Sequence, residues 1–366
     1  MSRIFIVCTG LGIVKRGFES YIELLSEKLS EHSDFKNVLT IFSAGTYKNR
    51  KFKTQNIRTI NRKSKVLYLF TKNIYHLFEI EQIFFFLFFI PYVLLLKPTA
   101  IYLGEYKVYC YLYKLRKLFK LKFSLILYTG GQAYPGLFDN DKDFVHHITD
   151  IYFNQIGKYK INFDRQFLIP HFIESDIQIN DQNYKDILLM AKGRKIVLSV
   201  GSIDNTVKRI DKLIDSLLEV KNDIFLILLG DSTSETENIN NKLAIFFEEN
   251  NYLVGQVERK LLPAYYSAAS VLASFSLKES FGLVNIEAML CGTPVVCHDY
   301  LEAKFVLKNH AEYLDLSKPK ISFKNLIQKF DASNKSIALH QFVESTYSWN
   351  ALSDSYIKMF KTFIHK

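Results

Sequence analysis

The sequence predicts an α/β protein of two domains, each built on a parallel sheet that helices cover on both faces. The chain has 366 residues, which is more than one ordinary hydrophobic core organises. Hydrophobic residues make up 48% of it, enough to bury two cores. In both halves, continuous apolar strands alternate with amphipathic helices, which is the pattern of a parallel sheet buried on both sides.

The first half opens with a strand, a glycine loop and a helix, and the alternation continues from there. Strands are expected at 3–9, 37–43, 100–104, 124–131 and 167–170. Helices are expected near 18–30, at 83–96 and at 108–120. His146 and His147 are expected in a further helix, on its surface or as caps.

The second half alternates more regularly. Strands are expected at 195–201, 223–230, 251–254, 271–276 and 293–296. Helices are expected near 207–220, 235–249, 261–269 and 283–290. This regularity makes the second half the clearer of two Rossmann-like domains.

The domain boundary is expected in the polar segment 172–194, with a first domain at 1–180 and a second at 181–345. Residues 346–366 are expected to form a helix that packs back on the first domain. Ligands of such folds bind beyond the carboxyl ends of the strands. Two facing domains therefore predict a site in the cleft between them.

The apolar run IFFFLFFIPYVLLL, residues 83–96, has the composition of a membrane span. It is shorter than the roughly 20 residues that a spanning helix needs, and Pro91 interrupts it. We expect a buried helix before a strand. A shallow membrane contact is the alternative.

Positive charge is concentrated in the first half of the chain. Residues 1–180 contain 25 Lys and Arg against 15 Asp and Glu, whereas residues 181–366 contain 22 of each. Residues 35–78 hold ten basic side chains and residues 106–138 hold six, with no acidic one in either block. Such blocks indicate an anionic partner or a solvated lysine-rich face. No nucleic-acid recognition module accompanies them, so a nucleic-acid partner is not expected.

The four cysteines are Cys8, Cys110, Cys291 and Cys297, and no two of them form a C-x-x-C pair. This spacing predicts neither a disulfide framework nor a zinc site. The start of the chain reads as a strand that enters a glycine loop, because its apolar run is too short for a signal peptide. We therefore expect a cytoplasmic location.

The stretch LKESFGLVNIEAMLCGTPVV, residues 277–296, places two carboxylates in an apolar, glycine-punctuated run. Glu279 falls in the loop after a predicted strand, and Glu287 falls inside the following helix. The amides around Gly282, Leu283 and Val284 are the unsatisfied donors of that helix's N-terminus, which favour an anion such as a phosphate. Carboxylates on both sides of a phosphate suit a nucleotide sugar. Alternatively, Glu279 caps the helix and Glu287 faces solvent.

The segment ESFGLVNIEAMLCGTPVV resembles the Glu–seven residues–Glu motif of glycosyltransferase family 4, a retaining family with the GT-B fold. The resemblance covers most of the chain. Further matching segments are GLGIVKRGFESYIELLSEKL (10–29), LSVGSIDNTVKRIDKLI (198–214), VGQVERKLLPAYYSAASVLASFS (254–276) and YSW (347–349).

The resemblance implies that the first domain binds the acceptor and the second binds the nucleotide sugar. It implies that Glu279 contacts the transferred sugar and that Glu287 holds the ribose. The implied contacts to the diphosphate come from Lys208, Arg209 and the amides of Gly282, Leu283 and Val284. Gly10 and Gly12 are implied to let the backbone approach the donor. Gln256 and Val257 border the implied base pocket.

Two departures from the family pattern stand out. Ser202 occupies a position where the family usually has an arginine, which removes charge-assisted hydrogen bonds to the diphosphate. Either Arg209 substitutes for it, or donor handling differs. The segment LYTGGQAYPG (127–136) also lacks the histidine that many family members carry there, so no acid or base is assigned.

The function expected from the resemblance is metal-independent, retaining hexosyl transfer from a nucleotide sugar to a glycan or a lipid-linked acceptor. Surface polysaccharide or glycolipid synthesis at the inner face of the plasma membrane is the expected setting, with the basic first domain against anionic lipid. The alternatives are an inactive nucleotide-sugar-binding subunit and a sugar-nucleotide epimerase of the same fold. No cofactor and no metal are expected. The DND sequence at 139–141 resembles a metal-binding Asp-x-Asp motif, but we expect turn-forming aspartates there.

Overall fold

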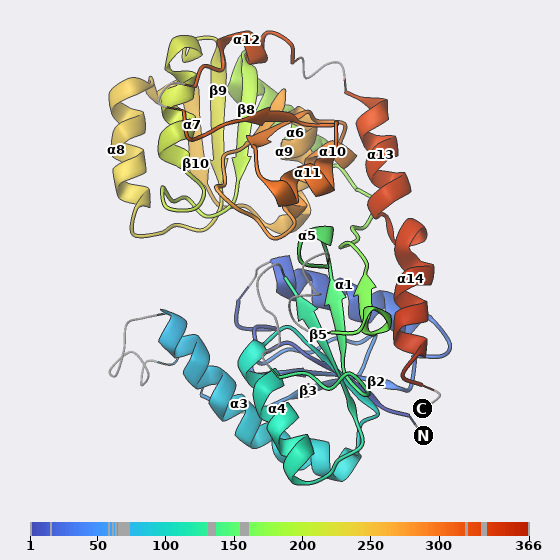
Figure 1. The fold of residues 1–366 in the computed structure, drawn as a ribbon. Coiled ribbons are helices and arrows are strands. Elements are labelled where there is room, and N and C mark those ends of the chain that lie inside the picture. The colour runs from blue at the N-terminus through green and yellow to red at the C-terminus, as the bar shows by residue number, and fades with distance from the viewer. Residues whose placement is uncertain are drawn as a thin grey trace. The chain divides into compact units, whose positions relative to one another are not determined.

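The computed structural model describes residues 2–14, 17–57, 59–60, 62, 64, 74–130, 137–153, 161–318, 321–330 and 335–364. It divides into two compact units (Figure 1). Unit 1 is Met1–His171 with Leu352–Lys366, and unit 2 is Phe172–Ala351. The division lies after His171 rather than after residue 180, because Phe172 packs on Trp349 and Ile173 pairs with Ser348, both inside unit 2.

Unit 1 contains a seven-stranded parallel sheet in the order β3-β2-β1-β4-β5-β6-β7. Its strands are β1 (Ile4–Val7), β2 (Leu39–Ser43), β3 (Thr54–Asn56), β4 (Ala100–Leu103), β5 (Ser124–Thr129), β6 (Phe144–His147) and β7 (Gln166–Leu168). Its helices are α1 (Gly17–Glu31), α3 (Ile74–Leu96), α4 (Tyr106–Leu118), α5 (Asp150–Phe153) and most of α14 (Trp349–Lys361). The residues of β1, β2, β4 and β5 are buried throughout, as expected for a sheet covered on both faces.

Unit 2 contains a six-stranded parallel sheet in the order β10-β9-β8-β11-β12-β13. Its strands are β8 (Lys195–Val200), β9 (Ile224–Leu229), β10 (Tyr252–Gly255), β11 (Val271–Ser274), β12 (Val295–His298) and β13 (Glu312–Leu314). Its helices are α6 (Asp181–Ala191), α7 (Ile210–Leu217), α8 (Thr236–Phe246), α9 (Leu262–Ala268), α10 (Leu283–Leu290), α11 (Leu301–Leu307), α12 (Lys324–Ile327) and α13 (Ile337–Tyr347).

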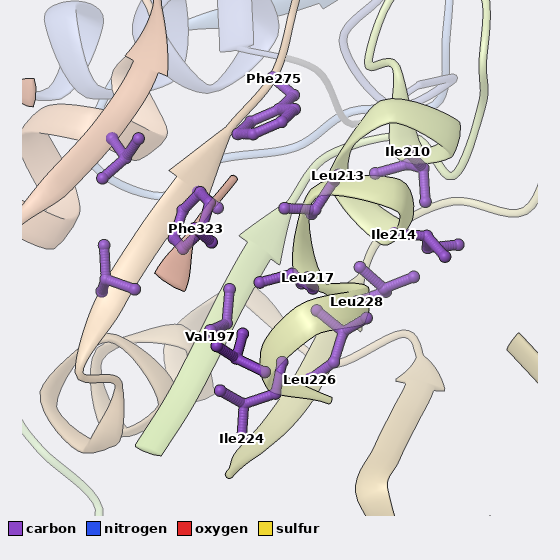
Figure 2. Close-up of a cluster of buried hydrophobic side chains, with 14 of the residues drawn as sticks. Val197, Ile210, Leu213, Ile214, Leu217, Ile224, Leu226, Leu228, Phe275 and Phe323 are labelled. Atoms are coloured by element: carbon purple, nitrogen blue, oxygen red, sulfur yellow. The ribbon is translucent and has the colours of Figure 1, made fainter. Parts of the chain in front are cut away.

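The core of unit 2 forms where α7 lies on the sheet. Helix α7 carries Ile210, Leu213, Ile214 and Leu217 at the spacing of one helical face, and all four are buried. They meet side chains of β8 and β9 in one cluster (Figure 2). This packing fixes the start of α7, and with it the loop that joins β8 to α7.

His146 and His147 lie in strand β6, not in the expected helix, and both are fully buried. His146 hydrogen-bonds the Tyr102 hydroxyl (2.8 Å) and the Ile169 carbonyl (2.9 Å). Burial lowers the pKa of His146 to about 4. These histidines are neutral members of the core, so the expectation of surface or capping residues was wrong. Two adjacent polar residues obscured this strand in the sequence. Side-chain hydrogen bonds allow them to be buried in the sheet.

Helix α3 is longer than expected and continues through Pro91. By length and composition alone, His76–Leu96 is long enough to cross a membrane, with a mean hydropathy of 1.9 and only 28% of it buried. One face, with Phe85, Phe89 and Val93, packs into unit 1. The opposite face exposes apolar side chains, so the expected burial holds for one side of this helix only. Its exposed apolar residues include Ile83, Leu87, Phe88, Leu94 and Leu95.

The carboxyl ends of β8 and β9 approach so closely that Gly230 admits no side chain. A Cβ atom there would lie 1.6 Å from the carbonyl oxygen of Gly201. We expect Gly230→Ala to destabilise unit 2 by about 3 kcal/mol, because backbone must move to relieve the clash. This corresponds to a fall in Tm of roughly 6–12 °C in calorimetry. Gly255→Ala is the matched control, since nothing lies within 4 Å of its added Cβ. Equal Tm values for the two variants would contradict the prediction.

Candidate donor site in unit 2

The candidate site lies at the point where the strand order of unit 2 reverses. Strand β8 is hydrogen-bonded to β9 on one side and to β11 on the other. The loops that follow β8 and β11 therefore leave the same edge of the sheet side by side. A backbone bond joins them directly, with the Leu277 amide donating to the Val207 carbonyl at 2.9 Å. Such switch points are where open α/β sheets bind ligands.

The loop after β8 is folded around the carboxylate of Asp204. Its Oδ1 accepts hydrogen bonds from the amides of Val207 (2.7 Å) and Lys208 (3.0 Å), and its Oδ2 accepts one from the Ser202 hydroxyl. Burial opposes ionisation, but these hydrogen bonds lower the pKa of Asp204 below its usual value. Ser202 therefore holds the loop, at the position where an arginine was expected from the family. Asp204 was not singled out from the sequence.

The structure brings together Lys208 and Glu279, two of the predicted site residues. Lys208 Nζ donates to Glu279 Oε1, which also accepts from the Ser276 hydroxyl at 2.8 Å. The side chain of Lys208 lies across Gly201. A Cβ atom added at Gly201 would lie 2.7 Å from Lys208 Cε. The two side chains are 19% and 23% exposed, so a ligand can reach a pair that is partly shielded from water. A cation and a hydrogen-bond acceptor thus share one point of the sheet edge.

Helix α10 begins beside this pair. Gly282 is its N-cap with a φ of 73°, a conformation that favours glycine. The amide of Asn285 closes the first turn on the Gly282 carbonyl at 2.9 Å. The amides of Leu283 and Val284 belong to that first turn, where an α-helix leaves its donors without intrahelical partners. A partial positive charge therefore accompanies Lys208 at this edge.

Glu287 lies inside α10, and each of its oxygens is held. Arg259 donates to Oε1 at 2.6 Å, and the Tyr266 hydroxyl donates to Oε2 at 2.9 Å. Burial, and then the charge of Glu287, raise the pKa of Tyr266 well above its usual value, so its hydroxyl stays a donor. The alternative of a simply solvent-facing Glu287 is excluded, since its side chain is only 18% exposed. Neither partner was predicted from the sequence, although each lies in the matching segment 254–276.

Arg209 is engaged elsewhere. Its guanidinium makes a bidentate contact with Asp211 at 2.9 and 2.8 Å, and this contact raises the pKa of Arg209. Gln256 is exposed and donates to Asp231, which follows β9, at 2.6 Å. Val257 is half-buried next to it. The structure thus groups Lys208 with Glu279 and pairs Arg209 with Asp211.

Gly10 and Gly12 belong to unit 1, where a close side-chain contact at Gly10 and the backbone conformation of Gly12 favour glycine. A Cβ at Gly10 would lie 1.9 Å from a carboxylate oxygen of Glu19, and Gly12 has a φ of 77°. Their part in donor binding stays a prediction. In the DND segment, the Asp141 amide donates to Asp139 at 3.1 Å, which closes a turn. Residues 131–136 of the segment LYTGGQAYPG lie outside the described residues.

Comparison with known proteins relates unit 2 to a family of glycosyl transferases. Residues 180–348 match the family model of the glycosyl transferases group 1. A D-inositol 3-phosphate glycosyltransferase of Xylanimonas cellulosilytica is 34% identical over 105 residues, which are 28% of this chain and 25% of the relative. An alpha-monoglucosyldiacylglycerol synthase of Streptococcus pneumoniae is 24% identical over 170 residues, which are 44% of this chain and 38% of the relative. The chain thus matches less than half the length of these curated relatives.

The likeness to solved structures extends over the whole chain and shows the fold. A sucrose-phosphate synthase from Thermosynechococcus elongatus superposes with a TM-score of 0.79 at 17% identity, covering 99% of each chain. The two parallel sheets and this superposition confirm the expected two-domain α/β architecture. The chain has the GT-B fold, and the match of residues 180–348 to the glycosyl transferases group 1 confirms the resemblance to glycosyltransferase family 4.

Proposed function

We propose that this protein transfers a hexosyl group from a nucleoside-diphosphate sugar to an acceptor hydroxyl, with retention of anomeric configuration. The observation that carries the proposal is the contact between Lys208 and Glu279 beside the N-terminus of α10. It places a cation, helix-terminal amides and a carboxylate at one edge of the sheet. A diphosphate needs the first two, and a sugar hydroxyl needs the third.

Departure of the nucleoside diphosphate is the step that this geometry serves. Breaking the bond between the anomeric carbon and the phosphate oxygen leaves negative charge on the diphosphate. The Lys208 ammonium and the amides of Leu283 and Val284 stabilise that charge as it develops. These groups supply the electrostatic stabilisation that a divalent cation gives elsewhere, so we propose a metal-independent reaction. Same-face attack by the acceptor, with the departing phosphate accepting its proton, gives retention.

Glu279 and Glu287 take separate parts in donor binding. In this proposal Glu279 accepts hydrogen bonds from hydroxyls of the transferred sugar, next to Lys208. Glu287 accepts them from the ribose, and Arg259 and Tyr266 fix its orientation beforehand. Gln256 and Val257 border the base. Preorganised acceptors lose little freedom when the donor binds, which favours affinity.

A second candidate function is donor binding without transfer. The hydroxyl of Ser202 bonds to Asp204, and the guanidinium of Arg209 is paired with Asp211. Neither therefore adds a free positive charge beside Lys208. A single cation at the diphosphate is better suited to binding the donor than to stabilising the diphosphate as it departs. This observation keeps an inactive nucleotide-sugar-binding subunit as the alternative.

The test of the proposal is a thermal-shift screen with UDP-, GDP-, ADP- and CMP-sugars, followed by an assay for release of the nucleoside diphosphate. Binding to the folded state raises Tm by mass action. A shift with one nucleotide class followed by release of its diphosphate supports transferase activity. A shift without release on any glycan or lipid acceptor supports the second candidate. No shift with any donor would overturn both.

For the acceptor, we propose a glycan or a lipid-linked sugar at an anionic membrane, in surface polysaccharide or glycolipid synthesis on the cytoplasmic side. Helices α3 and α4 run side by side in the same direction, since Gln82 bonds to the Lys107 amide and Phe86 contacts Tyr111. Their outer side presents apolar and basic groups together, which is the composition of an interfacial surface. The exposed residues on α4 and just beyond it include Lys114, Leu118, Phe119, Lys120 and Lys122. The name of the streptococcal relative, a diacylglycerol glycolipid synthase, agrees with this setting.

We expect the double variant Leu87→Asn and Leu94→Asn to bind anionic vesicles at least about tenfold more weakly than the wild type. Both leucines are exposed on the same side of α3 and are expected to be buried in the bilayer when the protein binds. Replacing them therefore removes roughly 3 kcal/mol of transfer free energy. Co-sedimentation with vesicles of phosphatidylcholine and phosphatidylglycerol at low salt measures the effect. Leu189→Asn is the matched control, because Leu189 is an exposed leucine of α6 in unit 2. Equal binding by both variants would contradict the membrane surface.

A further inference from the structure

Unit 1 contains a cavity of about 1300 Å³ between the loop after β2, strand β3 and helix α3. One wall is apolar and includes Ile60, Phe84 and Phe88. The two phenylalanines are four residues apart on α3 and so share one face of the helix. This face adjoins the exposed side with Leu87, and Phe88 itself is 52% exposed. The apolar wall of the cavity is therefore continuous with the outer surface of α3.

A second part of the lining, the cationic wall, carries positive charge. Lys48 and Arg50 line the cavity, both are exposed, and neither forms an ion pair within the described part of the chain. Among the described residues that line the cavity, none is acidic. Two neighbouring side-chain amides already form hydrogen bonds, since Asn56 accepts from Ser43 (2.8 Å) and Gln55 donates to Tyr92 (3.2 Å). Lys48 and Arg50 are thus the charged groups that the lining offers to an anion.

The cavity also shares a wall with the glycine loop of unit 1. Thr46 lines the cavity, and a Cβ at Gly12 would lie 3.1 Å from the Thr46 carbonyl oxygen. Likewise, a Cβ at Gly45 would lie 2.4 Å from the Leu11 carbonyl oxygen. Main chain therefore packs on main chain here. A polar head held at the cationic wall lies close to the loop that contains Gly10 and Gly12.

We propose that this cavity binds one molecule of an anionic lipid phosphate, with the phosphate at Lys48 and Arg50 and the hydrocarbon against Phe84 and Phe88. The volume exceeds the roughly 300–1000 Å³ of ordinary small-molecule pockets, which suits an elongated amphiphile. Charge complementarity selects the phosphate, and the opening toward α3 gives the chain a route from a bilayer. The identification of this lipid as the carrier of the acceptor rests on the proposed function.

The test is isothermal titration of wild-type protein with octyl phosphate below its micelle concentration, with octyl glucoside and inorganic phosphate as half-ligands. We expect saturable one-to-one binding of octyl phosphate, at least about tenfold tighter than either half-ligand. The double variant Lys48→Gln and Arg50→Gln should lose this advantage over octyl glucoside. The control double variant Lys36→Gln and Lys142→Gln removes equal charge from exposed positions of the same unit that do not line the cavity, and it should bind like the wild type.

A second pair of variants tests the apolar wall of the cavity. We expect Phe88→Asn to weaken octyl phosphate binding at least about threefold and Phe163→Asn to leave it unchanged, since Phe163 is an exposed phenylalanine of the same unit that does not line the cavity. Equal affinity for octyl phosphate and octyl glucoside would overturn the proposal. So would equal behaviour of either variant and its control. The donor-induced Tm shift of the wild-type protein separates the failures: a shift without octyl phosphate binding refutes the lipid site alone.

Discussion

Replacing Lys208 by methionine is expected to lower kcat by a factor of roughly 10²–10³, with a smaller change in KM. The ammonium stabilises charge that is fully developed only when the diphosphate leaves, so its loss weakens the transition state more than the ground state. Methionine keeps the length of the side chain that lies across Gly201. The variant therefore tests charge rather than packing. Steady-state release of the nucleoside diphosphate from the donor identified in the thermal-shift screen measures the effect.

Lys212→Met serves as the control for this variant, because Lys212 lies on α7 and forms no ion pair within the described residues. Its kcat should match that of the wild type. An unchanged kcat in Lys208→Met would remove Lys208 from the mechanism. The double variant of Lys208→Met with Glu279→Gln adds a finer test. If the two residues act on one reacting centre, their effects on kcat should be far from additive.

Replacing Glu287 by glutamine is expected to weaken donor binding about 10- to 100-fold. The variant keeps the size of the side chain and an acceptor for Tyr266, but it loses the charge that binds Arg259 and that, in the proposed function, binds the ribose hydroxyls. Hydrogen bonds to charged groups are worth about 1.5–3 kcal/mol. A donor at 100 times its Kd stabilises the wild type by about 2.7 kcal/mol, whereas a 30-fold weaker site gains only about 0.9 kcal/mol. The donor-induced Tm shift should fall accordingly.

Glu312→Gln is the matched control for Glu287→Gln, since Glu312 is an exposed carboxylate on β13 that pairs with Lys329. Its donor-induced shift should equal that of the wild type. A full shift in Glu287→Gln would show that the nucleotide binds elsewhere. Arg259→Met adds a second reading, because it removes the partner of Glu287 and leaves the carboxylate in place. We expect it to weaken donor binding less than Glu287→Gln does.

The elements predicted correctly are those with long apolar runs. Strands β8, β9 and β11 are continuous hydrophobic segments, and their burial on both faces makes the pattern unambiguous. Strand β3, with the sequence TQN, has no apolar residue, and only its pairing with β2 identifies it. The strand that contains His146 and His147 was mistaken for a helix for the same reason. Tertiary hydrogen bonds make these polar residues compatible with a sheet, and no local pattern announces such bonds.

The candidate site, like the fold, could be predicted only in part from the sequence. The family resemblance indicated Lys208 and Glu279 in separate segments, but they are 71 residues apart, and their contact depends on β8 pairing with β11. The order of strands in a sheet does not follow from the strands alone. Asp204, Arg259 and Tyr266 were missed because each acts through a partner that is remote in sequence or is brought close only by the fold of a loop. Their residue types alone are common and carry no signal.

The backbone bond from Leu277 to Val207 sets how tolerant this site is of sequence change. The spacing of the loops that carry Lys208 and Glu279 is fixed by main-chain atoms, which every residue type other than proline provides at Leu277. The side chains of Val207 and Leu277 are 48% and 39% exposed, so they are available to a sugar without supporting the loops. Under the proposed function, substitutions at these two positions alter which sugar fits while leaving the reacting groups in register. Donor preference and catalytic geometry would then be separable traits.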